Sequence, residues 1–175
     1  NTFFLDSVYI PKYEKYYSKV PPDPGTIDDA NTIVEGSIDV WRSTTIQDIQ
    51  RVFGKAWYSS LLPPTAQLLY PQSFHNTPPP GTPAGYWEAG PLRHLDTTQY
   101  SINIYTGVLT LNQEASDNDI IAVSYRTKGG AQYGERSQDI HDTDIVLKLI
   151  KPRLLYGNTS YPEWKLMLKN SYYVG

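Results

Sequence analysis

The sequence predicts a mainly β domain, antiparallel and β-sandwich-like, with one or two short helices and a long proline-rich loop. Three short stretches within residues 100–125 alternate apolar and polar side chains and are separated by turn residues, which is typical of antiparallel strands. The aromatic residues are biased toward tyrosine, with 15 Tyr and 4 Trp against 4 Phe, and such side chains suit half-buried strands. Because 175 residues is the size of one ordinary domain, we expect a single β-rich domain over residues 1–175.

The N-terminal part predicts two strands with a break between them. Residues 2–10 are apolar and aromatic, and Pro11 together with the proline-rich run at 21–25 interrupts them. Residues 37–42 alternate again and predict the second strand.

A short helix is predicted directly after the second strand. Residues 44–47 have the pattern of a capping box, and Gly54 is a plausible stop. The apolar residues at helical spacing are Ile46, Ile49, Phe53 and Trp57.

Residues 63–91 predict a long irregular loop, because they hold eight of the 14 prolines of the chain. Tyr70, Phe74, Tyr86 and Trp87 are expected to pin the loop to the domain at several points. We favour an ordinary aromatic-anchored connection, although long loops are often functional. Within the loop, Tyr86 and Trp87 are the residues we predict as possible partner or ligand contacts.

The C-terminal part predicts the remaining strands and a second short helix. Residues 100–111 read as a hairpin that turns at Thr106-Gly107, and residues 121–125 form the next strand. A glycine turn at 128–130 leads into a short strand, and residues 145–149 alternate as another. Pro162 is well placed in the first turn of a helix through Leu168.

Composition limits the classes of function. With 15 Lys and Arg against 18 Asp and Glu, the net charge of -3 provides no basic field for phosphates, so nucleic acid is not an expected partner. The absence of cysteine excludes disulfides, thiolate nucleophiles and cysteine-ligated metals. No apolar run approaches the about 18 residues of a membrane-spanning helix, so the chain is not expected to span a membrane itself. Its start at Asn1, without Met, suggests a processed chain or a piece of a longer protein.

The sequence marks no catalytic, cofactor or metal site. The acidic and histidine cluster at 139–144 lacks recognisable ligand spacing and reads as a solvated turn that leads into a strand. Glycine motifs for nucleophilic or phosphate chemistry do not occur. Paired carboxylates of a glycosidase stay open as an alternative, because they can come from distant strands, but Glu35, Glu88, Glu114 and Glu135 read as solvated side chains. We therefore expect no enzyme activity.

The four tryptophans leave a second class of function open, since aromatic platforms stack on sugars in glycan-binding β-sandwiches. Trp57 and Trp164 fit core packing at predicted helices. Only Trp87, in the proline-rich loop, fits an exposed contact.

Four segments carry a resemblance to a known family: YSINIYTGVLTLNQ, DNDIIAVSYRTKGGAQYGE, DTDIVLKLIKPR and YPEWKLMLKNSYYVG, in that order. They resemble the SprA/Sov family, the giant outer-membrane translocon of the type IX secretion system of Bacteroidota. The resemblance covers about residues 88–175, with a weaker echo at 40–42. The matching positions are Tyr100, Gly107, Leu111-Asn112, Ala122 to Tyr125, Gly134-Glu135, Leu147-Lys148-Leu149 and Trp164 to Asn170.

The resemblance implies that the chain is one section of a very large β-barrel through which folded cargo leaves the cell, in support of gliding motility, adhesion or protease secretion. Its role would be to shape the channel or to dock partner subunits. The implied partners are other sections of the parent translocon, type IX secretion subunits and transiting cargo. With a mean hydropathy of -0.46, we expect a water-facing section at the outer membrane that faces the periplasm or the cell surface. A glycan-binding or adhesion module is the alternative, followed by a cryptic hydrolase.

Overall fold

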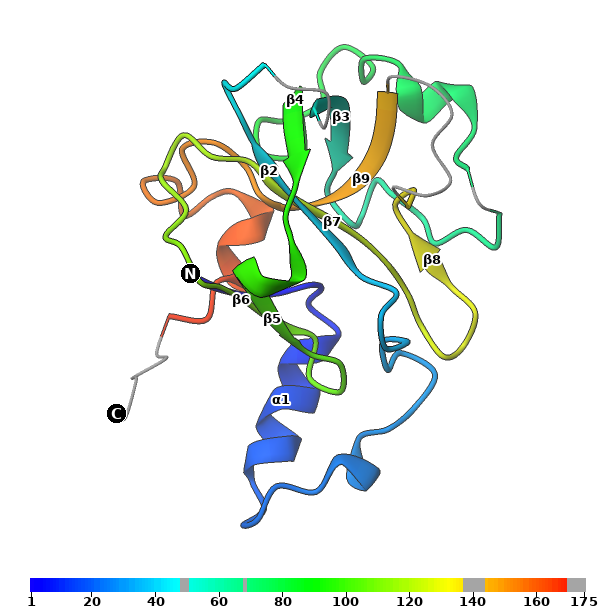
Figure 1. Ribbon diagram of the computed structural model, residues 1–175, viewed down its shortest axis with the longest axis vertical. Coiled ribbons are helices and arrows are strands. Elements are labelled where there is room, and N and C mark those ends of the chain that lie inside the picture. The colour runs from blue at the N-terminus through cyan, green and yellow to red at the C-terminus, as the bar shows by residue number, and fades with distance from the viewer. Residues whose placement is uncertain (48–50, 68, 137–143, 170–175) are drawn as a thin grey trace.

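The structure, a computed structural model, describes residues 1–47, 51–67, 69–136 and 144–169 (Figure 1). It confirms the prediction of a mainly β protein. The described residues contain one α-helix, α1 (Tyr9–Tyr17), and several short 3-10 helices. Figure 1 shows α1 at the end of the molecule that lies away from β3 and β9.

Five strands form a ring in which each strand is hydrogen-bonded to the next. Strand β7 pairs with β2 as well as with β9, so the sheet closes on itself. The pair β3–β9 is parallel, and the other pairs are antiparallel. In ring order the strands are β2 (Asp39–Ser43), β4 (Trp87–His94), β3 (Arg51–Trp57), β9 (Asp144–Lys151) and β7 (Ile121–Arg126). The arrangement is partly barrel-like, and the sandwich-like layering expected from the sequence is not clearly present.

The inner side of this ring is filled with apolar side chains. All five strands contribute to one buried cluster, as expected for residues that alternate between the two sides of a strand. The alternation predicted for residues 145–149 is confirmed, because Ile145, Leu147 and Leu149 all belong to this cluster. The other buried members are Trp41, Ala56, Leu92, Ile120 and Ala122.

A second, three-stranded sheet packs against the outside of the ring. It consists of β1 (Thr2–Phe4), β6 (Val108–Leu111) and β5 (Tyr100–Asn103), in that order. Strands β5 and β6 form the predicted hairpin, with Tyr100 opposite Leu111. Together with α1 and the outer face of β7, this sheet encloses the largest hydrophobic cluster. The glycine turn after β7 leads into the predicted short strand, β8 (Gln132–Tyr133).

The turn of the hairpin requires glycine at position 107. Gly107 has φ +61°, and a β-carbon there would overlap the ring of Tyr9. The Tyr9 hydroxyl donates a hydrogen bond to the Asn31 carbonyl at 2.7 Å, so the ring is held in place. This contact joins the hairpin to α1.

We expect the Gly107→Ala substitution to lower the free energy of unfolding by about 2–4 kcal/mol, from backbone strain and steric overlap together. Gly130→Ala is the matched control, because Gly130 has φ +88° but no atom within 4 Å of its β-carbon position. Urea unfolding followed by tyrosine fluorescence measures both. Equal losses in the two variants would show that the Tyr9 contact contributes nothing.

The short helix predicted to follow the capping-box residues 44–47 and to stop at Gly54 is wrong where the structure describes it, because residues 51–57 form β3. Phe53 and Trp57 have helical spacing, but the same segment also alternates along a strand. Strand β3 is hydrogen-bonded to β4 on one side and to β9 on the other, and these ladders override local propensity. Residues 44–47 are not helical either, and residues 48–50 lie outside the described part of the chain.

The strand predicted for residues 2–10 is confirmed only for Thr2–Phe4. Helix α1 begins at Tyr9 and contains Pro11 in its first turn. Proline is tolerated there because the first N–H groups of a helix have no intrahelical partner. Pro11 therefore lies within a helix and does not end a strand. The predicted C-terminal helix is a 3-10 helix, Pro162–Leu166.

The loop predicted for residues 63–91 ends earlier than expected, because β4 begins at Trp87 and includes Pro91. The Pro91 carbonyl accepts a hydrogen bond from the Thr44 amide at 3.0 Å, just beyond the end of β2 at Ser43. In an antiparallel ladder the nitrogen of a residue faces the same neighbour as its carbonyl. The missing N–H of Pro91 therefore lies beyond the paired part of β2, where its loss costs little.

Candidate functional site

Tyr86 and Trp87, the predicted contact residues, lie side by side where β4 begins. Tyr86 is half-buried against the largest cluster, with its ring edge-on to Tyr58 at a centroid distance of 5.5 Å. Trp87 is half-buried on the outer face of the ring, 6.1 Å from Trp57. Consecutive residues of an extended chain point to opposite sides, so the two rings serve different clusters. Their role as partner or ligand contacts stays a prediction.

The proline-rich loop is pinned to the outer face of the ring, as the sequence predicted. Tyr70 and Phe74 pack in a small cluster around Trp57, and the indole N–H of Trp57 donates to the Phe74 carbonyl at 3.1 Å. The rings of Tyr70 and Phe74 meet edge-on at 5.3 Å. A 3-10 helix, Gln72–His75, carries this part of the loop.

An open groove of about 610 Å³ lies beside this cluster. Trp57, Phe74 and Leu61 contribute aromatic and aliphatic surface, and Pro78 to Pro80 line it as well. Hydroxyl and carboxamide groups come from Ser73, Asn76, Thr77 and Thr82. The volume is within the about 300–1,000 Å³ typical of small-molecule sites. Its uncharged lining suits a neutral ligand that offers both apolar faces and hydroxyl groups.

Glu135 holds the base of the same loop. Its side chain is buried, and its two oxygens accept hydrogen bonds from the amides of Tyr70 and Val146, each at 2.8 Å. His75 Nε2 lies 3.0 Å from the first of these oxygens. The sequence interpretation of Glu135 as solvated is therefore wrong, because the carboxylate satisfies backbone donors that no strand partner reaches.

The other carboxylates considered in the sequence do not converge on a cleft. Glu35 and Glu114 are exposed, as predicted. Glu88 is half-buried and accepts from the Arg153 guanidinium at 2.7 Å.

Glu163 is a further buried carboxyl group that sequence reasoning missed. It is completely buried in the 3-10 helix Pro162–Leu166, and neither oxygen has a hydrogen-bond partner within the described residues. Burial, together with the nearby Glu88 carboxylate, raises the pKa of Glu163 to about 8. In the sequence, the feature that could have indicated the burial of Glu163 is its position between Pro162 and Trp164, at the start of a predicted helix. A group with this pKa is protonated at neutral pH.

We expect the Glu163→Gln variant to gain stability relative to the natural protein as pH rises. The folded state binds the Glu163 proton with a pKa of about 8, above the ordinary value of 4.5, so this contribution is complete below pH 4.5 and is lost as pH rises through 8. Glutamine resembles the protonated acid and cannot ionise. The free energies of unfolding measured with urea at pH 5 and pH 8.5 should differ by a few kcal/mol less in the variant than in the natural protein. The exposed control Glu114→Gln should leave the difference unchanged, and parallel pH profiles for both variants would refute the assignment.

Lys148, which belongs to the family-like segments, is a completely buried cation on the outer face of β9. Its Nζ donates to Asp6 at 2.5 Å and to the Tyr125 hydroxyl at 2.9 Å. The ammonium group also lies 4.2 Å from the centre of the Tyr133 ring. The Lys148–Asp6 ion pair connects β9 to the N-terminal segment. Asp6, the Tyr125 hydroxyl and the Tyr133 ring are the partners that the buried Lys148 charge needs.

The described residues contain no group of three or more His, Cys, Asp or Glu side chains that could hold a metal ion. The cluster considered at 139–144 lies outside the described residues except for Asp144, which pairs with Lys55 at 3.1 Å. The helices within the described ranges include none long and apolar enough to cross a membrane.

No model of a known protein family matches the chain, and no curated protein matches it significantly. The resemblance to the SprA/Sov family thus stays a prediction from the residues.

Proposed function

We propose that this chain is a section of an outer-membrane protein-conducting translocon of the type IX secretion kind, in which it shapes the channel or docks partner subunits. The observation that supports the proposal is where the family-like positions lie. Gly107 packs against Tyr9, Glu135 holds the proline-rich loop, and Lys148 is the buried partner of Asp6. These three positions each hold two distant segments together, whereas the family-like positions Asn112, Lys165 and Lys169 are exposed and could contact partners.

The ring itself is not the path for cargo in this proposal. Its inner side is filled by Trp41, Leu92, Leu147 and their neighbours, and a five-stranded ring leaves no space beyond its side chains. Cargo would pass along surfaces formed with other sections of the parent protein. We place the section on the water-facing side of the outer membrane, toward the periplasm or the cell surface, with type IX subunits as partners.

The test is the removal of residues 1–175 from the parent protein, with a flexible linker in their place. We expect export of cargo to stop while the parent protein still reaches the outer membrane, as followed by immunoblots of membrane and medium fractions. Normal export would refute the proposal. If the deletion lowers the amount of parent protein, charge reversals on exposed faces of this section replace it, and one of them should block export at normal protein levels.

A glycan-binding or adhesion module is the second candidate, and the groove beside Trp57 and Phe74 favours it. Sugars stack on aromatic rings and bond to hydroxyl and amide groups of the kind this groove provides. A glycan array probed with the purified chain tests this function. Signals that disappear in Phe74→Ala would support it, and silence across the array would remove it.

A further inference from the structure

Strand β5 is an outermost strand of the small sheet, and its outer edge is open. Backbone groups of successive residues in an antiparallel strand point alternately to its two sides. The Gln99 carbonyl accepts from the Asn112 amide on the β6 side, at 2.9 Å. The carbonyl of Tyr100 and both backbone groups of Ile102 therefore point away from β6. They have no hydrogen-bond partner among the described residues.

The open part of this edge is short, because both of its ends are closed. The carbonyl of Ile104, just past the strand, accepts from the Ile33 amide at 3.0 Å. Before Tyr100 the chain forms a 3-10 helix, Thr97–Gln99, and is no longer extended. A long partner strand would meet the segment around Ile33, so the edge suits a strand that is equally short.

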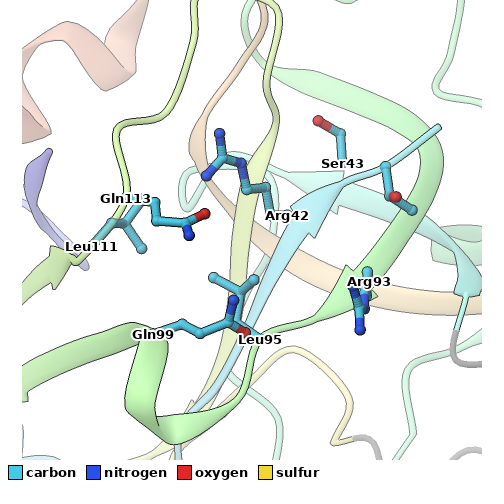
Figure 2. A pocket seen from close by; sticks show the side chains of 8 residues that line it. Arg42, Ser43, Arg93, Leu95, Gln99, Leu111 and Gln113 are labelled. Carbon is cyan, nitrogen blue, oxygen red and sulfur yellow. The ribbon is translucent and has the colours of Figure 1, made fainter. Parts of the chain in front are cut away.

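The ring does not supply the missing neighbour of β5. A hollow of about 160 Å³ lies between β2 and the start of β5 (Figure 2). Arg42 of β2 lines the hollow, and Gln99 and Leu111 line it from the small sheet. Adjacent strands of a sheet lie about 4.8 Å apart, which leaves no room for such a hollow between them. Strand β2 therefore stands apart from β5.

The side chains of the small sheet also fit a further strand beside β5. Ile102 and Ile104 are only half-buried, although both pack against the largest hydrophobic cluster. On the other face, Thr2, Thr110 and Ser101 lie directly opposite one another across the three strands. The Thr2 and Thr110 hydroxyl groups are 3.3 Å apart, and Ser101 is exposed at the open end of this row. A neighbouring strand would cover the isoleucines and continue the row of hydroxyl groups.

A second copy of β5 meets these requirements. In an antiparallel pair with a two-fold axis at Ser101, Ile102 of each copy lies opposite Tyr100 of the other, so that the open backbone groups face one another. The two Ser101 residues then form a pair without backbone hydrogen bonds, in which side chains are close and hydroxyl groups can bond. Where Ile33 closes the edge of one copy, the chain of the other copy has already left the strand as a 3-10 helix.

We infer that this chain forms a two-fold symmetric dimer through β5, in which the two small sheets join into one sheet. The assembly stops at two copies because the opposite edge of the small sheet is covered, with the Leu168 amide donating to the Thr2 carbonyl at 2.9 Å. The contact is far smaller than the about 1,200–2,000 Å² of stable complexes, so we expect a dissociation constant of about 0.1–1 mM. The dimer goes beyond the proposed export function and holds with or without it.

A disulfide trap tests the position of the axis, because the chain has no cysteine and Ser101→Cys introduces a single thiol. Opposite residues of a pair without backbone hydrogen bonds have Cα atoms about 4.5 Å apart, which a disulfide can span. In a glutathione redox buffer, Ser101→Cys should form about tenfold or more covalent dimer than Ser18→Cys, since pairing raises the effective concentration of the thiols. Ser18 is the matched control, exposed at the end of α1. Equal amounts of dimer from both variants would overturn the inference.

Sedimentation equilibrium at millimolar concentration measures the association without a cross-link. The natural chain should show a monomer–dimer equilibrium. Ser101→Lys should be monomeric, because it places two like charges opposite each other and lysine protects edge strands from pairing. Ser18→Lys makes the same change in net charge and should dimerise as the natural chain does.

Ile102→Pro tests the backbone contact, because it removes an N–H that faces the partner and none that faces β6. Ile102→Ala is its control, since it also loses the isoleucine side chain but keeps the N–H, and it should still dimerise when the proline variant does not. Dimers of Ser101→Lys, or assemblies of the natural chain larger than two copies, would assign the contact to another surface. A natural chain that stays monomeric at millimolar concentration would exclude the dimer.

Discussion

Replacing Glu135 with glutamine should lower the free energy of unfolding by about 3–5 kcal/mol, one of the two largest effects expected in this protein. The carboxylate accepts from the amides of Tyr70 and Val146 at 2.8 Å and faces His75 Nε2 at 3.0 Å. Glutamine has the same shape but only one acceptor oxygen, so its NH₂ group would face a backbone N–H. Unsatisfied buried donors cost about 1–3 kcal/mol each.

Urea unfolding measures this loss, and amide hydrogen exchange localises it. The Tyr70 amide should exchange much faster in Glu135→Gln, because the variant releases the base of the proline-rich loop while the ring keeps its own ladders. Glu35→Gln, at an exposed position, should stay within about 0.5 kcal/mol of the natural chain. A Glu135→Gln variant as stable as this control would show that water replaces the carboxylate.

The loop and the groove depend on the same carboxylate. Glu135 fixes the amide of Tyr70, Tyr70 packs edge-on against Phe74, and Phe74 lines the groove. Loss of the carboxylate therefore predicts a change in the groove as well as lower stability. Glu135 therefore affects the groove through the loop, because it is not among the residues that line the groove.

Residues 145–149 and residues 51–57 show which parts of the fold the sequence can predict. The apolar residues of 145–149 fit only the alternation of a strand, and the strand predicted from this alternation is correct. The second has apolar residues that fit both helical and strand spacing, and only its two neighbours in the ring decide between them. Local pattern is sufficient for hairpins such as β5–β6, whose partner is adjacent in the chain, and insufficient for a strand between distant partners.

The candidate sites were hidden for the same reason. Trp57 of β3 and Phe74 of the proline-rich loop are separated in the chain, and only the fold brings them to one groove. Glu135 reads as an ordinary polar residue after a glycine, because the amides that it accepts from belong to Tyr70 and Val146. A single sequence shows which side chains exist, whereas the closure of the ring determines which of them meet.

The second large effect is expected for Lys148→Met, which should cost about 3–5 kcal/mol at neutral pH by leaving the Asp6 carboxylate without its cation. Methionine fills the space of the lysine stem but provides no charge. Lys19→Met, at an exposed position, is the matched control and should stay within about 0.5 kcal/mol of the natural chain. The double variant Asp6→Asn/Lys148→Met should recover part of the loss, because it buries no uncompensated charge.

The pH dependence distinguishes loss of the ion pair from loss of packing. Burial alone would raise the pKa of the Asp6 carboxyl, but attraction from Lys148 holds it below its ordinary value of 3.8. In the natural chain this group therefore stabilises the fold above pH 3.8, and the contribution is lost as pH falls through the lower folded pKa. Without Lys148, burial dominates and the folded pKa rises above 3.8, so Lys148→Met should lose stability as pH rises through that value. Urea midpoints from pH 3 to pH 8 should thus show opposite contributions from Asp6 in the two proteins, whereas parallel profiles would mean that Lys148 acts only by filling space.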